Sequence, residues 1–174
     1  MKFPRKKYLL LLLVIIISGS ARASSKTVKD TSLCLEITGK ATCSGLQLSD
    51  VTVLLIQDNQ EVEKVVLKDK GKFRFLLKKN SFYTIRLSKG GYVTRSISIN
   101  TELPQGTKWG IWRFEAEVQL FRENPLMNND YLDYPVAIIS YHQAKDAFDY
   151  NKKYTAIIKQ NIHKPEKPEM VNKD

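Results

Sequence analysis

Histidine and cysteine are scarce in this chain of 174 residues, with two of each, and their scarcity limits the available chemistry. The histidines are His142 and His163, and neither Cys34 nor Cys43 has a histidine nearby with which to form a catalytic pair. The cysteine spacing matches no zinc site. No G-x-S-x-G, H-E-x-x-H or phosphate-binding glycine loop is present. We therefore expect a protein that is not an enzyme and holds neither metal nor cofactor.

Long apolar runs are also missing, apart from one near the N-terminus. Positive charges precede an apolar segment at 8–17, and Ala21-Arg22-Ala23 supplies a small-residue cleavage site. About ten apolar residues are too few to cross a bilayer, which takes roughly 20. We predict that residues 1–23 are a cleaved signal peptide and that the mature chain starts at Ser24. The mature protein, with no transmembrane segment, is then expected in the periplasm, at the cell surface or outside the cell.

Acidic residues are fewer than basic ones, but the imbalance is moderate once the leader is removed. Residues 1–23 contain five of the 28 basic residues and no acidic ones, so the remainder has a net charge of +5. Such an excess favours anionic partners only weakly, and export argues against a nucleic-acid partner.

The pairing of the two cysteines stays open at the level of sequence. Export would bring Cys34 and Cys43 into an oxidising compartment. In one extended strand, nine steps of about 3.3 Å would hold their sulfurs too far apart to bond. A turn at 38–40 would bring them together. Either they form a disulfide, or they are two small apolar residues.

Between residues 31 and 121 the hydrophobic pattern alternates with a period of two, which is typical of strands with one buried face. Turn-forming residues separate the runs at short intervals. We predict strands near residues 31–39, 51–57, 61–68, 72–77, 81–88, 92–100 and 110–121. No crossover helix fits between them, so a parallel α/β fold is excluded. Seven short strands predict an all-β, antiparallel β-sandwich over 24–124.

The pattern changes after Pro125. We predict a loop at 126–134, a strand at 135–141, a turn at 143–146 and a short run at 147–148. Asp149 would cap a helix over about 150–162. We expect this extension, 125–162, to pack on the sandwich. The charged, proline-rich tail, 163–174, is expected to be disordered.

Three segments resemble carboxypeptidase regulatory-like domains, which have a transthyretin-like, Ig-like sandwich. These segments are Gly45-Leu46-Gln47-Leu48-Ser49-Asp50-Val51-Thr52-Val53, Asp69-Lys70-Gly71-Lys72-Phe73-Arg74-Phe75 and Ser88-Lys89-Gly90-Gly91-Tyr92-Val93. In this interpretation Gly71 takes a positive φ in a tight turn, and Gly91 relieves backbone strain in a second turn, before Tyr92. The resemblance implies an accessory, adhesion or assembly module, and the C-terminal part is similar to small exported proteins of the Bacteroidetes lineage.

Carboxylates and tyrosines are the other candidate functional groups. The closest acidic pairs are Asp130 with Asp133 and Asp146 with Asp149, but they lack the rhythm of a calcium loop. We interpret them as turn and cap residues rather than a hydrolytic pair. Five of the eight tyrosines lie near the C-terminus: Tyr131, Tyr134, Tyr141, Tyr150 and Tyr154. These rings would either bind a partner or pack the extension onto the sandwich. The candidates for binding are Tyr131, Tyr134 and Tyr141.

Positive charge is concentrated in the middle of the chain. Between residues 64 and 95 the basic residues are Lys64, Lys68, Lys70, Lys72, Arg74, Lys78, Lys79, Arg86, Lys89 and Arg95, against Asp69 alone. Lys72, Arg74 and Arg86 alternate with core residues, so they should lie on the wet side. We predict that these three form a basic sheet face, which either binds an anionic polymer or keeps the sheet soluble.

Two functional hypotheses follow for an exported, non-enzymatic binding or assembly module of the cell envelope. In the first, the basic sheet face binds an anionic glycan or lipopolysaccharide. In the alternative, the tyrosine-rich C-terminal part recognises a protein partner in an envelope complex. A hydrolase built on the aspartates is the least favoured reading.

Overall fold

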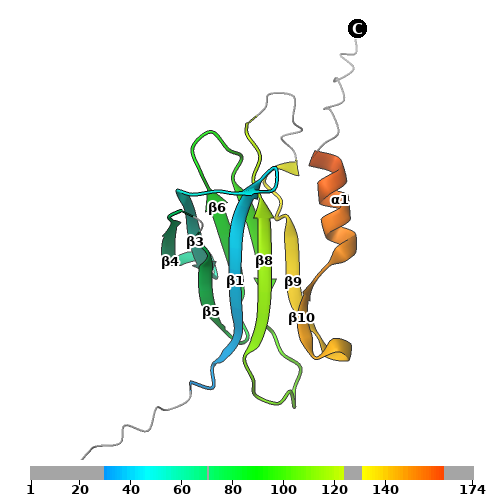
Figure 1. The fold of residues 1–174 in the computed structure, drawn as a ribbon. Coiled ribbons are helices and arrows are strands. Elements are labelled where there is room, and N and C mark those ends of the chain that lie inside the picture. The colour runs from blue at the N-terminus through cyan, green and yellow to red at the C-terminus, as the bar shows by residue number, and fades with distance from the viewer. Residues whose placement is uncertain (1–29, 70, 124–130, 163–174) are drawn as a thin grey trace, which may run out of the picture.

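Two β-sheets face each other in the computed structural model of the chain, which describes residues 30–69, 71–123 and 131–162 (Figure 1). The elements in chain order are β1 (Leu33–Cys43), β2 (Leu46–Gln47), β3 (Val51–Gln57), β4 (Gln60–Leu67), β5 (Phe73–Lys78), β6 (Phe82–Ser88), β7 (Arg95–Asn100), β8 (Trp112–Gln119), β9 (Ala137–His142), the 3₁₀ turn η2 (Gln143–Lys145), β10 (Ala147–Tyr150) and α1 (Lys152–Ile162). The predicted all-β sandwich is confirmed, but the described residues contain ten strands rather than seven.

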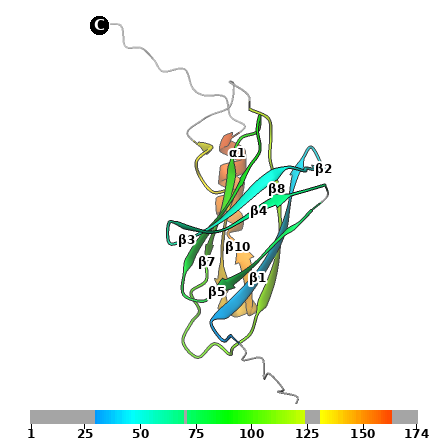
Figure 2. The same cartoon turned by 90° about the vertical axis from the view of Figure 1, so that its left-hand side faces the viewer.

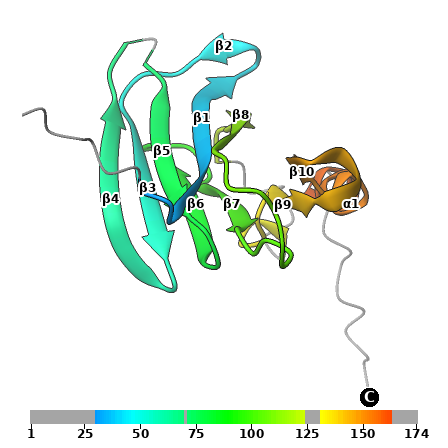
Figure 3. The same cartoon turned by 90° about the horizontal axis from the view of Figure 1, so that it is seen from below.

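The smaller sheet contains β5, β1 and β8 side by side, with the short β2 beside one end of β1. The larger sheet has the order β10-β9-β7-β6-β3-β4. Looking along the strands separates the two layers (Figure 3). Two pairings, β1 with β8 and β7 with β9, are parallel, so the expectation of purely antiparallel sheets is wrong. A crossover helix is not needed because the chain passes through the other sheet between β1 and β8.

Alternation in the sequence places the core between the sheets. In β5, Phe73 and Phe75 point inward with their ring centroids 5.6 Å apart, while Arg74 between them is exposed. Tyr83, Ile85 and Leu87 of β6 are buried in the same way from the opposite layer. Burying these apolar side chains stabilises the sandwich by roughly 25 cal/mol per Å² of area removed from water.

The strand β1 is continuous through residues 38–40, where a turn was expected to bring the two cysteines together. Gly39 lies inside β1 and is buried, so the turn at 38–40 is wrong. Cys34 and Cys43 therefore lie near opposite ends of one strand, and both are free thiols. Their separation excludes a disulfide within the chain. Burial raises the pKa of the Cys34 thiol to about 11, so this cysteine is protonated at neutral pH.

A glycine is required in β1 because Phe73 lies against it. A Cβ atom on Gly39 would lie 2.2 Å from Cζ of Phe73 and 2.8 Å from the carbonyl oxygen of Ala116. Both distances are below any van der Waals contact. The absence of a side chain at this position lets the Phe73 ring fill the space between β5, β1 and β8.

The turn before β5 also differs from the expected one. Gly71 does not take a positive φ, and Asp69 does, at 49°. Gly71 is needed for space instead, because a Cβ there would lie 2.8 Å from the carbonyl oxygen of Lys68. The expectation for Gly91 agrees with the structure, where its φ is 74°.

Thr101 connects two chain segments just beyond β7. Its side chain is fully buried, and its Oγ1 accepts a hydrogen bond of 3.0 Å from the Ser81 amide. The same hydroxyl lies 2.7 Å from the Lys78 carbonyl oxygen, to which it donates. We expect Thr101→Val, which keeps the shape but removes the hydroxyl, to lower the free energy of unfolding by about 2 kcal/mol. Urea unfolding would measure this loss.

The matched control for that substitution is Thr107→Val. Thr107 donates a hydrogen bond of 2.6 Å to the Pro104 carbonyl oxygen in an exposed loop, where water can replace it. We expect a loss well below that of Thr101→Val. Similar losses for the two variants would contradict a structural role for the buried hydroxyl.

The C-terminal extension packs along one side of the sandwich. Strand β9 pairs with β7 and β10 pairs with β9, while α1 lies beside them (Figure 1). Seen from the side of β3 and β4, α1 is on the far side (Figure 2). The helix is capped by Asn151, whose Oδ1 accepts from the Tyr154 amide at 3.0 Å, so Asp149 as the cap is wrong. Among the described residues, no helix has the length and apolarity to cross a membrane.

The expected signal peptide and disordered tail lie outside the described residues, as does Asp130.

Candidate binding groove

Strand β8 forms the edge of the smaller sheet on the side of the C-terminal extension. It pairs with β1 along eight residues, from Trp112 to Gln119, and with no other strand that the structure describes. Figure 3 shows β8 at the end of its layer, near β9, β10 and α1. Because a strand has hydrogen-bonding groups on both sides, an edge of this length presents a row of unpaired backbone N–H and C=O groups.

A groove of about 630 Å³ runs beside this edge. Six consecutive residues of β8, 114–119, form one side of it, and parts of β7, β9, β10 and α1 form the other. The apolar side chains that line it are Ile97, Phe114, Ala116, Val118, Phe121, Val136, Ala137, Ile139, Ile158 and Ile162. Its volume and largely apolar lining are those of typical ligand-binding pockets.

An aromatic cluster packs the C-terminal extension against the start of β8. The Trp112 ring makes edge-to-face contacts with Tyr141 and Phe148, with centroids 5.2 and 6.0 Å apart. The indole Nε1 of Trp112 also donates to the carbonyl oxygen of Asp146 at 2.8 Å. These contacts hold β10 against β8 at this end, so the edge is accessible only further along the strand.

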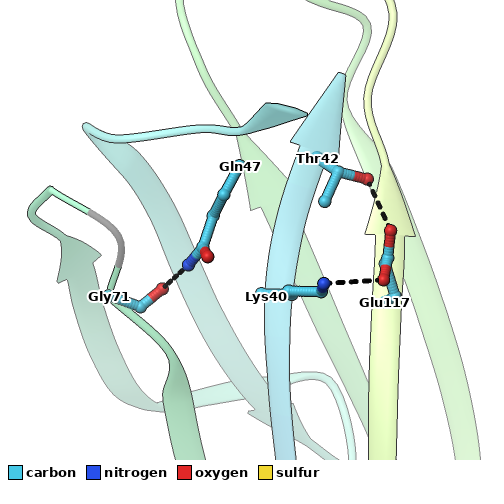
Figure 4. A network of polar contacts seen from close by, with 5 residues as sticks. All are labelled: Lys40, Thr42, Gln47, Gly71 and Glu117. Atoms are coloured by element: carbon cyan, nitrogen blue, oxygen red, sulfur yellow. Dashed lines mark hydrogen bonds and ion pairs between the residues drawn. The ribbon is translucent and has the colours of Figure 1, made fainter. Parts of the chain in front are cut away.

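The Glu117 side chain of β8 is held by residues of β1. Glu117 accepts an ion-pair contact from Lys40 at 2.9 Å and a hydrogen bond from Thr42 at 3.2 Å (Figure 4). Both partners belong to β1, so Glu117 bends over the sheet and away from the open side. The hydrogen bond and charge of Lys40, followed by the Thr42 hydrogen bond, lower the pKa of the Glu117 carboxyl, which keeps it ionised at neutral pH. The groove side of β8 is therefore left without a guarding charge from this residue.

Figure 4 also shows a hydrogen bond between β2 and the segment that precedes β5. The side-chain amide of Gln47, in β2, donates to the carbonyl oxygen of Gly71 at 2.8 Å. This bond connects the end of the β1–β2 turn to the segment that enters β5. It fixes the opposite side of the smaller sheet and contributes nothing to the groove.

The predicted basic sheet face is divided between the two sheets. Lys72, Arg74 and Arg86 are exposed, as alternation predicts. However, Arg74 lies on β5 of the smaller sheet and Arg86 on β6 of the larger one. Since the inward residues of both strands meet in the core, these side chains point outward on opposite sides of the sandwich. The prediction that the three residues share one face is wrong.

Part of the positive charge is also neutralised. Glu36, on β1, contacts Arg74 at 2.9 Å and Arg113 at 3.7 Å. The hydrogen bond and charge of Arg74 lower the pKa of the Glu36 carboxyl. Arg95 is not at the surface at all, because only 1% of its side chain is exposed. The charge count along the sequence therefore overstates the basic surface.

The three tyrosines proposed as binding residues lie at two places outside the groove. Tyr131 and Tyr134 are close together, with ring centroids 6.1 Å apart, and Tyr134 is exposed. Tyr141 belongs to the aromatic cluster, and its hydroxyl donates to Asp146 at 2.6 Å, which raises its pKa. Two other tyrosines are nearer to the groove. Tyr150 lines it, and Tyr154 anchors α1 by donating to the Pro135 carbonyl oxygen at 3.0 Å.

The aspartates and His142 do not converge. Asp146 accepts from Tyr141, Asp149 accepts from Lys145, and Asp133 is exposed. His142 is exposed at the end of β9. In the part of the chain that the structure describes, no group of three or more histidine, cysteine or acidic residues is placed to hold a metal ion.

A second cleft, of about 380 Å³, lies at the closed end of β8. It is formed by the loop 105–111 together with Trp112, Tyr141, Gln143 and Asp146, and it is more polar than the groove. Of the β8 edge it reaches only Trp112, the first residue of the strand. We therefore regard the larger groove as the candidate site.

The sequence contained a signal for this groove, but only a partial one. Alternation in β8 identified a strand with one apolar face, yet it could not show which neighbour the strand lacks. Arg95 shares the parity of Ile97 and Ile99, so its inward direction was visible in the alternation. Its charge made it look like a surface residue instead.

Comparisons with known proteins add little to this geometry. No family model and no curated protein matches the sequence. Similar solved structures include 3-chlorocatechol 1,2-dioxygenase from Rhodococcus opacus 1CP, with 11% identity over 51% of this chain and a TM-score of 0.37. Catechol 1,2-dioxygenase from Acinetobacter sp. ADP1 shows 9% identity over 56% and a TM-score of 0.40. The protein S.CueP shows 14% identity over 49% and a TM-score of 0.32.

The chain spans between 55% and 60% of the length of these three proteins. At such scores the likenesses carry no argument about function.

Proposed function

We propose that this protein is a non-enzymatic binding module that takes up an extended segment of a protein partner along the open edge of β8. The observation that supports it is the edge of β8, which pairs with no second strand among the described residues, beside a groove of about 630 Å³ that residues 114–119 line. Strand addition at such an edge gains affinity from main-chain hydrogen bonds, and side chains of the added strand gain specificity from the adjoining pockets.

The proposal favours a protein partner over an anionic polymer. Helix α1 and strands β9 and β10, which form one side of the groove, all come from the tyrosine-rich C-terminal part. By contrast, the exposed basic residues considered for a polymer lie on opposite sides of the sandwich. We place the module in the cell envelope or outside the cell, because the N-terminal sequence has the pattern of a secretory signal. The resemblance to carboxypeptidase regulatory-like domains agrees with an accessory role.

Hydrogen exchange with a pool of randomised ten-residue peptides would test strand addition. We expect the pool to slow exchange of the β8 amides within 114–119 that point away from β1, which are every second residue, because an added strand supplies acceptors for these N–H groups. Ala116→Phe should abolish that protection, since Ala116 lines the groove and a phenyl ring there would occupy it.

The control variant is Thr84→Phe, which adds a ring of the same size on the outer face of β6. It should leave the protection of β8 unchanged. Unaltered exchange at 112–119 in the unsubstituted protein, at saturating peptide, would contradict the proposal. So would equal loss of protection in the two variants.

A further inference from the structure

Arg95 is a buried cation without a counter-charge in the described structure. Its side chain is 1% exposed, and it lines the groove at the start of β7. One terminal nitrogen donates to the Leu132 carbonyl oxygen at 3.3 Å, and the guanidinium lies 5.3 Å from the centre of the Phe121 ring. Its Nε has no hydrogen-bond partner, and no carboxylate among the described residues lies within ion-pair distance.

Such an arrangement is costly for the free protein. Removing an ionic group from water is compensated only by close partners, and a carbonyl and an aromatic ring replace a carboxylate incompletely. Burial lowers the pKa of Arg95 to about 10, a value that still leaves the guanidinium protonated at neutral pH. The groove therefore carries a positive charge in its wall.

A second unpaired polar group lies on the α1 side of the same groove. Thr155 lines it, and its buried Oγ1 has no hydrogen-bond partner among the described residues. Buried polar groups in native proteins are nearly always paired, so two exceptions in one apolar groove need an explanation. A ligand that accepts from both would pair Arg95 and Thr155 together.

We propose that the groove binds the C-terminal end of an extended peptide, whose α-carboxylate meets Arg95 and Thr155. This inference rests on the proposed function and names the part of the partner that is recognised. A single carboxylate next to an apolar side chain matches one cation in a mostly apolar groove. Glu115, on the β8 side of the groove, disfavours a ligand with many negative charges.

The position of Arg95 also sets the direction of the bound chain. Phe121, over which the guanidinium lies, follows the last residue of β8 by two positions. A peptide whose C-terminus reaches this point runs parallel to β8, as β1 does on its other side. Its preceding residues then lie beside 114–119, where the edge is open.

Two peptide pools test the inference on the complete chain. Both are randomised ten-residue peptides, one with a free C-terminal carboxylate and one amidated, passed over immobilised protein and quantified by mass spectrometry. We expect the free-acid pool to be retained at least tenfold more than the amidated pool. Arg95→Met should remove that preference, because methionine keeps an unbranched apolar stem but cannot pair with a carboxylate.

The charge-matched control is Arg86→Met, which removes one exposed positive charge from the outer face of β6. It should keep the tenfold preference. Thr155→Val provides a second variant on the α1 side and should reduce the preference. If Arg95→Met fails to fold, as judged by circular dichroism, the comparison of the two pools on the unsubstituted protein still decides.

The outcomes separate this inference from the proposed function. Equal retention of the two pools, with slowed exchange at 112–119, would overturn the carboxylate site and leave strand addition intact. No retention and no protection would overturn both. Arg95-dependent binding of palmitate without retention of either pool would overturn the peptide assignment in favour of a small amphipathic acid.

Discussion

Gly39→Val is expected to lower the free energy of unfolding by about 3 kcal/mol, near the upper end of the range for overpacked cores. The added side chain would collide with the Phe73 ring, whose Cζ lies 2.2 Å from the position of a Cβ atom. It would also collide with the backbone oxygen of Ala116 at 2.8 Å, and a backbone atom of a paired strand cannot rotate away. Chemical unfolding followed by circular dichroism would measure the loss.

Two further variants show whether the ring causes that loss. Gly90→Val is the control, because a Cβ atom there meets nothing within 4 Å and no positive φ is involved. In a double-mutant cycle, Phe73→Leu should reduce the cost of Gly39→Ala, since the shorter side chain vacates the space. Equal costs at positions 39 and 90, or strict additivity in the cycle, would refute the explanation.

Trp112→Ala is expected to lower the free energy of unfolding by about 3 kcal/mol and to detach the C-terminal extension from β8. The substitution removes both edge-to-face contacts, with Tyr141 and Phe148, and the hydrogen bond to the Asp146 carbonyl oxygen. Since these contacts hold β9 and β10, whose residues line the groove, retention of peptides should fall as well. Native-state hydrogen exchange should show faster exchange in β9 and β10.

The comparison residue is Trp109, whose side chain is 40% exposed. Trp109→Ala removes an indole of the same size and should cost less than half as much. Phe148→Ala, which removes another member of the cluster, should resemble Trp112→Ala in its exchange pattern. Unchanged exchange over 137–150 in Trp112→Ala would show that the aromatic cluster does not hold the extension.

Several features could be predicted from the sequence because they depend on short-range patterns. Alternation located most strands to within a few residues, and the C-terminal helix was placed two residues early, at 150 instead of 152. Local turn chemistry identified Gly91 correctly. It was wrong for Gly71, where glycine is needed because a Cβ atom would lie too close to a carbonyl oxygen, and not because of a positive φ.

Other features depend on which strands become neighbours, and alternation carries no such information. Arg74 and Arg86 have the same wet parity, but they belong to different sheets and point in opposite directions. The cysteines looked close enough for a disulfide only if β1 were interrupted, and Gly39 turned out to make room for Phe73 instead of forming a turn.

The order of residues was enough to predict strands with one buried face and a C-terminal helix, because the burial of alternate residues is a local property of an extended backbone. Only contacts between distant segments establish that β8 lacks a second partner among the described strands, that α1 lies across the groove from it, and that Arg95 is buried in the groove wall. These facts arise from contacts between segments far apart in the chain. The alternation along one strand shows which of its faces is buried. It does not show which strand lies beside it, since several neighbours are compatible with the same pattern.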